Sequence, residues 1–178
     1  AGCTHAVMEV SSHALCLERV RGVPFAVGAF TNLTQDHLDF HRTMEAYREA
    51  KGRLFAQSGR AVLNGDDLAG RWYAERCPCG FSTYCCTGAG DLTAQEVRLF
   101  PDHVEFRAVA GEETVPATLN IPGAFTVSNA LCALSCAREL GIPLNKAAAA
   151  LAGVPGVKGR MEVAPWPGPG TVVLDYAH

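Results

Sequence analysis

The chain has 178 residues, of which 48% are hydrophobic and 19% are charged, and its formal net charge is -3 at pH 7. This composition is typical of one globular domain with enough apolar side chains to bury a core. The negative balance argues against nucleic acid as a partner, because phosphate binding needs a basic surface. No apolar run is long enough to span a membrane and no secretory signal is present, so we expect no membrane insertion.

Residues 1–76 alternate short apolar runs with amphipathic ones. The apolar runs predict strands over residues 5–10, 25–31 and 60–63. The amphipathic runs predict helices over residues 13–19, 44–57 and 68–76. Each of these helices is preceded by side chains that can cap its first turn: Ser11 and Ser12, then Thr43, then Asp67.

The rest of the chain changes character twice. Between residues 80 and 120, short alternating runs predict strands over 92–99, 103–109 and 114–119, which would form a small antiparallel sheet. Helices are predicted over 125–140 and 145–151, with strands near 161–163 and 171–174. Because strands alternate with helices, we expect an α/β fold whose mostly parallel sheet is flanked by helices, with the antiparallel sheet appended.

The eight cysteines fall into two groups. Four lie within apolar patterns and are expected to be buried thiols: Cys3, Cys16, Cys132 and Cys136. Four others form a polar cluster: Cys77, Cys79, Cys85 and Cys86. Their spacing is CxC followed by CC, whereas a zinc knuckle uses paired CxxC, so we favour reduced cytoplasmic thiols and keep zinc as the alternative.

A polar stretch over residues 31–41 follows a predicted buried strand and precedes a predicted amphipathic helix. The carboxyl end of a parallel strand is where an α/β protein places its ligands. The helix after this loop carries Tyr47 and Lys51 four residues apart, so both side chains point to one face. This loop and helix are therefore where we expect the site.

Two side chains near this loop are candidate metal ligands. Glu9 ends the first predicted strand, where its carboxylate either meets a cation or emerges into solvent. His37 is either a ligand or a hydrogen-bonding loop residue. Asp36, Asp39 and His41 crowd the same loop and favour a site, in which some of them would orient the ligands.

Four further side chains have both a functional and an ordinary interpretation. Lys51 taken alone is a solvated helix lysine, because an ammonium repels cations. Arg160 has the planar fork that suits phosphate, or it forms a surface ion pair. Asp175 ends the last predicted strand, where it would bind a ribose or cap the backbone. Asn129 lies in an apolar helix and needs a partner, either a base edge or a backbone group.

These residues lie in motifs that together resemble the Mur ligases, and most closely the MurE type, the UDP-N-acetylmuramoyl-tripeptide synthetases. The motifs follow the family order along nearly the whole chain: MEVSSHAL at 8–15, TNLTQDHLDFH at 31–41, AYREAK at 46–51, NGDD at 64–67, IPGAFTVSNAL at 121–131, GRME at 159–162 and DYAH at 175–178. Each motif is moderately specific, and the ordered set is highly specific.

The resemblance implies that residues 1–178 are a fragment of the central, ATP-binding domain of a three-domain enzyme of the bacterial cytoplasm that acts in peptidoglycan synthesis. ATP would phosphorylate the D-glutamate carboxylate of UDP-N-acetylmuramoyl-L-alanyl-D-glutamate, and the amine of diaminopimelate or lysine would attack this acyl phosphate. Mg²⁺ and cationic side chains would offset the repulsion between the anions. The phosphate loop is expected before residue 1 and the amino-acid-selecting domain after residue 178, so we expect no ligation by the fragment alone.

The resemblance also implies a role for each matching residue. The metal ligands would be Glu9, His37 and Lys51, with Lys51 carbamylated and thereby an anionic oxygen ligand. Lys51 and His37 would also be the catalytic residues. The UDP-sugar-peptide substrate would contact Ser11 and Arg19. The contacts to ATP would be Asn129, Arg160, Asp175 and His178.

Two positions depart from the family pattern. Thr126 stands where the family usually shows asparagine, and Leu17 stands where some relatives carry a glutamine toward the substrate. Two alternatives stay open. One is another ligase of the superfamily, of the folylpolyglutamate or cyanophycin type, although the SSH after Glu9 argues against it. The other is a non-catalytic Mur-like module that binds nucleotide or zinc.

Overall fold

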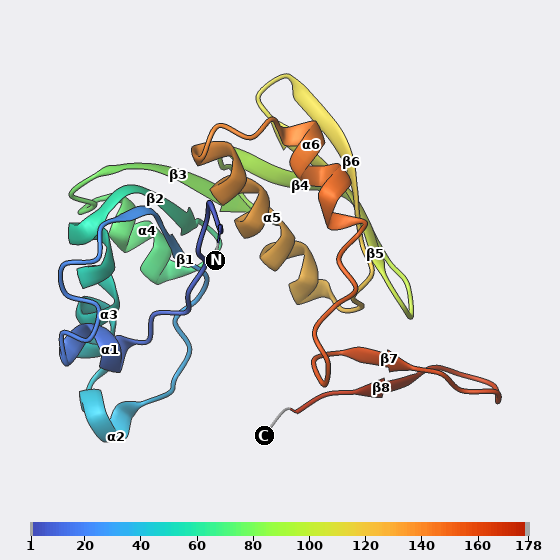
Figure 1. Cartoon of the computed structure of the whole chain (residues 1–178), viewed down its shortest axis with the longest axis horizontal. Helices are drawn as coiled ribbons and strands as arrows, with labels where there is room; N and C mark the ends of the chain where they lie inside the picture. The colour runs from blue at the N-terminus through green and yellow to red at the C-terminus, as the bar shows by residue number, and fades with distance from the viewer. Residues whose placement is uncertain (1, 177–178) are drawn as a thin grey trace.

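The computed structural model describes residues 2–176, and a six-stranded sheet forms its centre (Figure 1). The strands follow one another in sequence order: β1 (Phe25–Phe30), β2 (Ser58–Asn64), β3 (Gly80–Cys85), β4 (Leu92–Leu99), β5 (Val104–Ala110) and β6 (Glu113–Leu119). The junctions from β1 to β4 are parallel, and those from β4 to β6 are antiparallel.

Helices cover both faces of this sheet (Figure 1). The helices are α1 (Ser12–Cys16), α2 (Leu38–His41), α3 (Met44–Gly52) with the 3₁₀ turn η1 (Arg53–Gln57), α4 (Leu68–Ala74), α5 (Ala124–Glu139) and α6 (Leu144–Leu151), of which α1 and α2 pack on α3. The central residues of β2 belong to two hydrophobic cores, one on each face of the sheet. Ala61 and Leu63 belong to a core with α4 and η1, whereas Val62 belongs to the larger core under α5 and α6. Successive side chains of a strand point to opposite faces, so β2 is apolar on both.

The predicted caps are confirmed. Ser11 accepts the Ala14 N–H at 3.2 Å, Thr43 accepts the Ala46 N–H at 3.1 Å, and Asp67 accepts the Ala69 N–H at 2.7 Å. Each bond satisfies a backbone donor that has no partner inside its helix. The helix predicted after Thr43 is confirmed as α3 and η1, and those predicted over 125–140 and 145–151 are confirmed as α5 and α6.

The strand predicted over residues 5–10 is wrong. These residues have no regular structure, and Val7 is fully exposed. Within residues 2–176, β1 pairs only with β2, and nothing pairs with its other edge. An apolar run becomes a strand only when a neighbour satisfies its backbone groups, so the sequence pattern alone is insufficient.

The mostly parallel α/β sheet flanked by helices is confirmed, but the antiparallel strands are differently placed. Sequence reasoning missed β3, which pairs in parallel with both β2 and β4. Through β3, strands β4 to β6 continue the main sheet and are not a separate appendage. The separate small sheet is a hairpin of β7 (Glu162–Ala164) and β8 (Val172–Leu174), which is antiparallel and stands away from the main sheet (Figure 1).

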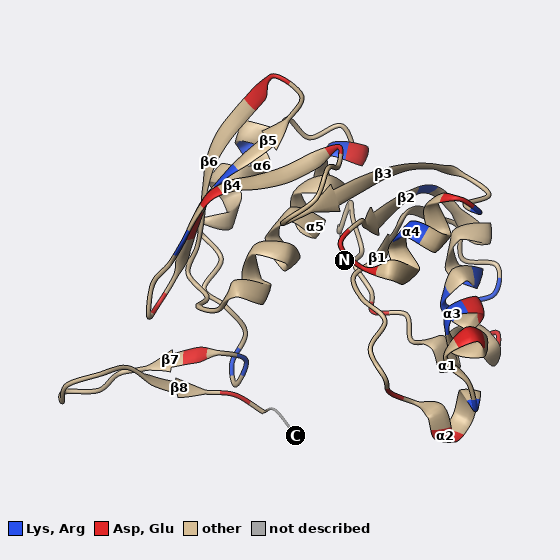
Figure 2. Ribbon diagram, turned by 180° about the vertical axis from the view of Figure 1, so that it is seen from behind, with Lys and Arg blue, Asp and Glu red and all other residues tan. Residues whose placement is uncertain are grey.

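Two general features complete the architecture. Figure 2 shows the basic and acidic segments of the described residues intermixed along the chain, with both signs around α3. No helix within residues 2–176 is long and apolar enough to cross a membrane.

Candidate active site

The polar loop after β1 is held by the end of β2. The Asn64 side chain, which is 7% exposed, donates to the Thr31 carbonyl at 2.7 Å. Asp67 accepts the Leu33 N–H at 2.9 Å with the carboxylate oxygen that does not cap α4. Both bonds cross from one parallel strand end to the next, so they fix the direction in which the loop leaves the sheet.

The NGDD motif, residues 64–67, also holds the loop that follows β3. Asp66 accepts the backbone N–H of Cys86 and the hydroxyl of Thr87, the latter at 2.8 Å. These hydrogen bonds lower the pKa of Asp66, although its burial opposes them as the largest single effect. Sequence analysis used this motif for the resemblance and a helix cap, and missed its role as the clamp between three strand ends.

His37 has a left-handed backbone, with φ 56° and ψ 23°, and stands at the start of α2. Its N–H donates to the Asp36 carboxylate at 2.7 Å. Its ring lies edge-on to the His13 ring at 5.0 Å and to the Tyr47 ring at 5.9 Å between centroids. The side chain is 43% exposed, so its ring nitrogens are accessible to a ligand.

His41 and Ser12 form a buried hydrogen-bonded pair next to Tyr47, whose ring contacts His37. His41, which is 8% exposed, bonds the Ser12 hydroxyl through Nε2 at 2.8 Å and stacks on Tyr47 at 4.9 Å. Burial lowers the pKa of His41. Sequence analysis placed His41 in the site loop but missed Ser12 as its partner, because helix periodicity alone does not show which serine of the SSH motif turns inward.

Lys51 lies half-buried on α3, on the same helix face as Tyr47, as predicted. Its ammonium is 5.3 Å from the centre of the Tyr47 ring. Burial lowers the pKa of Lys51, and three nearby carboxylates, Asp67, Glu9 and Asp36, oppose that shift. The electrostatic effect of Glu9 and Asp36 on this amine shows that the structure brings the irregular segment before α1, the loop after β1 and the helix α3 together around Lys51.

Of the three expected metal ligands, Glu9 carries the carboxylate oxygen that a hard cation such as Mg²⁺ prefers. Such a cation keeps several waters and binds substrate phosphates as well as protein groups. Residues 2–176 contain no group of three or more His, Cys, Asp or Glu side chains that could hold a metal ion. Glu9 is exposed and His37 is partly exposed, and Lys51 would join them once it carried a carbamate.

The two residues expected to contact the UDP-sugar-peptide lie on either side of α1. The Ser11 hydroxyl is exposed and already accepts a backbone bond as the helix cap. Arg19 is exposed in the turns after α1. Leu17, at the position that departs from some relatives, is 53% exposed nearby.

The residues expected to contact ATP come from two other elements. Asn129 is exposed in the first half of α5. Arg160 is exposed beside the hairpin, and one carboxylate oxygen of Asp175 accepts the Met161 N–H at 2.8 Å, which brings the GRME and DYAH motifs together. His178 lies outside the described residues. In both views the hairpin lies toward the start of α5 and away from α3 (Figures 1 and 2).

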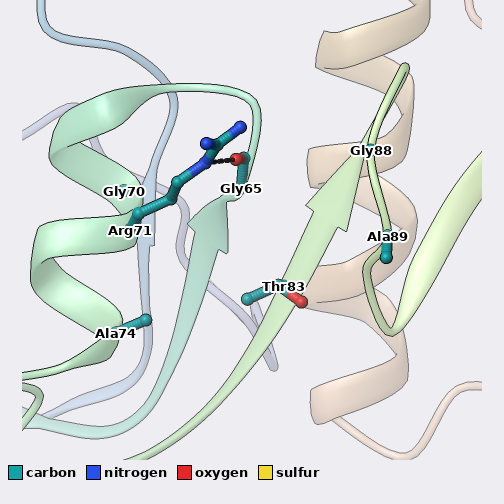
Figure 3. A pocket seen from close by; sticks show the side chains of 7 residues that line it. All are labelled: Gly65, Gly70, Arg71, Ala74, Thr83, Gly88 and Ala89. Atoms are coloured by element: carbon teal, nitrogen blue, oxygen red, sulfur yellow. Dashed lines mark hydrogen bonds between the residues drawn. The ribbon is translucent and has the colours of Figure 1, made fainter.

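A cavity of about 320 Å³ opens between α4 and the turn that joins β3 to β4 (Figure 3). Arg71 lines it and donates through Nε to the Gly65 carbonyl at 2.7 Å. Gly88 and Ala89 line the other side. None of the predicted site residues lines this cavity, so it is separate from the cluster around Lys51.

The cysteine cluster does not converge on one point. Cys77 and Cys79 pack against the smaller core, whereas Cys86 packs against the larger one. Cys85 is buried, and its thiol donates to the Ala89 carbonyl at 3.2 Å. Thr126, the other departure from the family pattern, is buried in the first turn of α5 and donates to the carbonyl of Pro122, which precedes that helix, at 3.0 Å.

Comparison with known families gives one family match. The model of the Mur ligase middle domain matches residues 1–137. Among the curated relatives that match over the whole chain are the UDP-N-acetylmuramoyl-L-alanyl-D-glutamate--2,6-diaminopimelate ligase of Halalkalibacterium halodurans, at 44% identity, and the UDP-N-acetylmuramyl-tripeptide synthetase of Roseiflexus sp., at 41%. The chain spans 38% of the length of each.

Solved structures agree with the fold. A UDP-N-acetylmuramoyl-L-alanyl-D-glutamate--2,6-diaminopimelate ligase matches with a TM-score of 0.83 and 30% identity, over 95% of this chain and 36% of its own. The MurF ligase of Thermotoga maritima in complex with ADP matches with a TM-score of 0.71 and 21% identity, over 89% of this chain and 37% of its own. At 21% identity, the second match shows only that the two folds are similar.

Proposed function

This chain belongs to the Mur ligase middle domain family, and from that premise we propose that it is the central, ATP-binding part of a ligase that extends UDP-N-acetylmuramoyl-L-alanyl-D-glutamate. The enzyme would join an amino acid to the D-glutamate carboxylate in peptidoglycan synthesis. We propose diaminopimelate as that amino acid before lysine, because relatives that cover the chain at 44% and 40% identity are named diaminopimelate ligases. The remaining domains would belong to the same cytoplasmic enzyme.

The environment of Lys51 carries the proposal. Only a neutral amine adds carbon dioxide, and burial shifts Lys51 toward that form. The carbamate that results is anionic and offers oxygen to a hard cation. Lys51 is half-buried near the carboxylates of Glu9, Asp36 and Asp67, and the effect of burial outweighs that of the carboxylates, so the net shift of its pKa is toward the neutral amine that a carbamate needs.

In the proposed reaction, Glu9, His37 and carbamylated Lys51 would hold Mg²⁺. When bound, ATP and Mg²⁺ would supply the phosphoryl group that activates the substrate carboxylate and the positive charge that offsets anion repulsion. His37 is held for this task by its neighbours, since its ring packs against Tyr47, on which His41 stacks. The Asn64 and Asp67 bonds keep the loop in place while the substrate binds.

The remaining site residues have hydrogen-bonding groups available for their proposed roles. Ser11 accepts one backbone bond and can still donate its hydroxyl proton to the UDP-sugar-peptide. Asp175 uses one carboxylate oxygen for Met161, which leaves the other for a ribose hydroxyl. Arg19, Arg160 and Asn129 are exposed and available to anions or to a base edge.

The test uses the full-length enzyme with ATP, Mg²⁺ and UDP-N-acetylmuramoyl-L-alanyl-D-glutamate. We expect product and ADP in equal amounts with diaminopimelate, and a much slower reaction with lysine. Absence of ATP-dependent product with both amines would refute the proposed function. Faster turnover with lysine would refute only the choice of amine.

A second experiment tests the site itself. Lys51→Arg keeps the positive charge but cannot form the carbamate, and we expect it to lower turnover by at least about 100-fold, since loss of an outer partner of a metal ligand already costs about 10–100-fold. Lys146→Arg, on the exposed face of α6, is the matched control and should keep full activity. Native mass spectrometry with bicarbonate should place the added carbon dioxide on Lys51. Full activity of Lys51→Arg would refute the role of this lysine.

A further inference from the structure

Two thiols meet where the chain passes from α4 to β3. The sulfurs of Cys77 and Cys79 are 3.7 Å apart, in contact across the single residue Pro78. Proline fixes φ near –65°, so this three-residue turn has little freedom to separate its two ends. The side chains therefore already face each other.

The pair lies beside a cavity and not inside the closed core. Both cysteines are partly buried against the smaller core. A cavity of about 260 Å³ adjoins them and is lined by Trp72, Arg76, Cys77 and Pro78 among others. Cys77 lines this cavity, whereas Cys79 contacts Cys77 and packs against the smaller core.

The other cysteines have different surroundings. Cys85 donates its thiol to the Ala89 carbonyl, so it is occupied by a backbone partner. Cys132 is 7% exposed within the larger core, where a reagent has no access. Cys3 is exposed on the irregular segment that precedes α1. Cys77 combines contact with a second sulfur, that of Cys79, and a place in the lining of a cavity.

We propose that Cys77 and Cys79 are a redox-active dithiol that forms a reversible disulfide by exchange with a low-molecular-weight disulfide. The Cys77 thiolate attacks one sulfur of the reagent, which breaks its S–S bond and releases one thiolate. The Cys79 sulfur then attacks Cys77 in the mixed disulfide and releases the second thiolate. The protein loses two electrons and two protons, and the reagent is reduced to two thiols.

The surroundings of the two sulfurs favour this order of steps. Burial, and after it the hydrogen bond to Cys77, raise the pKa of Cys79, so Cys79 keeps its proton during the first step. Once Cys77 is in the mixed disulfide, its thiol no longer raises the pKa of Cys79; burial still raises that pKa, and the guanidinium of Arg60 lowers it. Closure needs the sulfurs to approach by about 1.7 Å to reach bonding distance, which side-chain rotation can supply.

The test uses the purified intact protein and oxidised glutathione, followed by acid quench and alkylation of the remaining thiols. Trypsin cuts after Arg76 and Arg98, so one peptide, residues 77–98, carries Cys77, Cys79, Cys85 and Cys86. We expect this peptide to lose two labels and the mass of two hydrogen atoms, with both remaining labels on Cys85 and Cys86 in its fragment spectrum. Dithiothreitol should restore all four labels.

Two single variants separate the steps. Cys79→Ser should stop at the mixed disulfide, with one glutathione on Cys77, and Cys77→Ser should leave Cys79 unmodified. Cys16→Ser, a partly buried cysteine on α1, is the matched control and should behave as the unchanged protein. The proposal is wrong if the peptide of residues 77–98 from the unchanged protein keeps labels on both Cys77 and Cys79, retains glutathione, or loses labels at Cys85 and Cys86. These outcomes concern thiol chemistry and leave the proposed ligase function untouched.

Discussion

Asp67 performs two structural tasks at once, so its replacement gives a sharp test of how the site loop is held. One oxygen accepts the Ala69 N–H at 2.7 Å and caps α4, and the other accepts the Leu33 N–H at 2.9 Å from the site loop. Asp67→Ala removes both bonds. Asp67→Asn keeps a capping oxygen but replaces the second acceptor by an amide donor.

The expected loss follows from the two bonds. Replacing a capping aspartate by alanine costs about 1 kcal/mol, and a hydrogen bond to a charged group contributes about 1.5 kcal/mol in a partly exposed position. Asp67→Ala should therefore lower the free energy of unfolding by about 2.5 kcal/mol. Asp67→Asn, which loses only the Leu33 bond, should lower it by about 1.5 kcal/mol.

Urea unfolding followed by circular dichroism measures both losses. With a slope of about 2 kcal/mol per molar urea, Asp67→Ala should move the midpoint down by about 1.2 M and Asp67→Asn by about 0.7 M. Glu112→Gln, in the exposed turn between β5 and β6, is the control and should unfold like the unchanged protein. Equal midpoints for Asp67→Asn and the unchanged protein would refute the claim that this carboxylate anchors the loop.

Three further substitutions test other parts of the fold. Gly70→Ala would place a Cβ against the Asn64 carbonyl, so we expect the free energy of unfolding, measured in urea, to fall by about 3 kcal/mol. The control is Gly153→Ala, whose Cβ meets only the Ala150 oxygen at 3.5 Å and which should change stability by less than about 0.5 kcal/mol. Equal urea midpoints for the two variants would contradict the packing of α4 on β2. Burial lowers the pKa of His41 below its ordinary value of 6.5. Its contribution to the free energy of unfolding is therefore fully present above pH 6.5, and it is lost as the pH falls through the pKa of His41 in the folded protein. Stability of the unchanged protein should thus fall more steeply from pH 7 to pH 5 than that of His41→Phe, and parallel curves would refute this role. Glu139→Gln breaks the forked pair with Arg60, at 2.7 and 3.3 Å, and should cost about 1 kcal/mol at pH 7. The Arg60 bond lowers the Glu139 pKa below 4.5, so this difference should disappear as the pH falls below that value, and its persistence in acid would point to lost packing.

Local sequence signals predicted those parts of the fold that depend on neighbours in the chain. Ser11, Thr43 and Asp67 each cap the helix that follows, and the helix of Tyr47 and Lys51 presents both side chains on one face. These features need only a few adjacent residues, and their physics is contained in a short window.

Pairing between strands was harder to predict. The apolar pattern of residues 5–10 matches a strand, yet these residues have no partner in the described chain. The strand β3, which begins at Gly80 and carries a serine and a threonine, has a weaker pattern but lies between two partners. A strand is stabilised by its neighbours, and a window of sequence does not contain them.

The amino-acid sequence alone predicts the helix caps, most of the helices and the ordered family motifs, and it names candidate residues for the chemistry. Which of these residues meet depends on the tertiary structure. It placed Glu9 and Asp36 near the Lys51 amine, turned Ser12 inward to His41, and made the NGDD motif a clamp between strand ends. The reason is that helix and cap signals are local, whereas a site is assembled from strand ends far apart in the chain that only sheet pairing brings side by side.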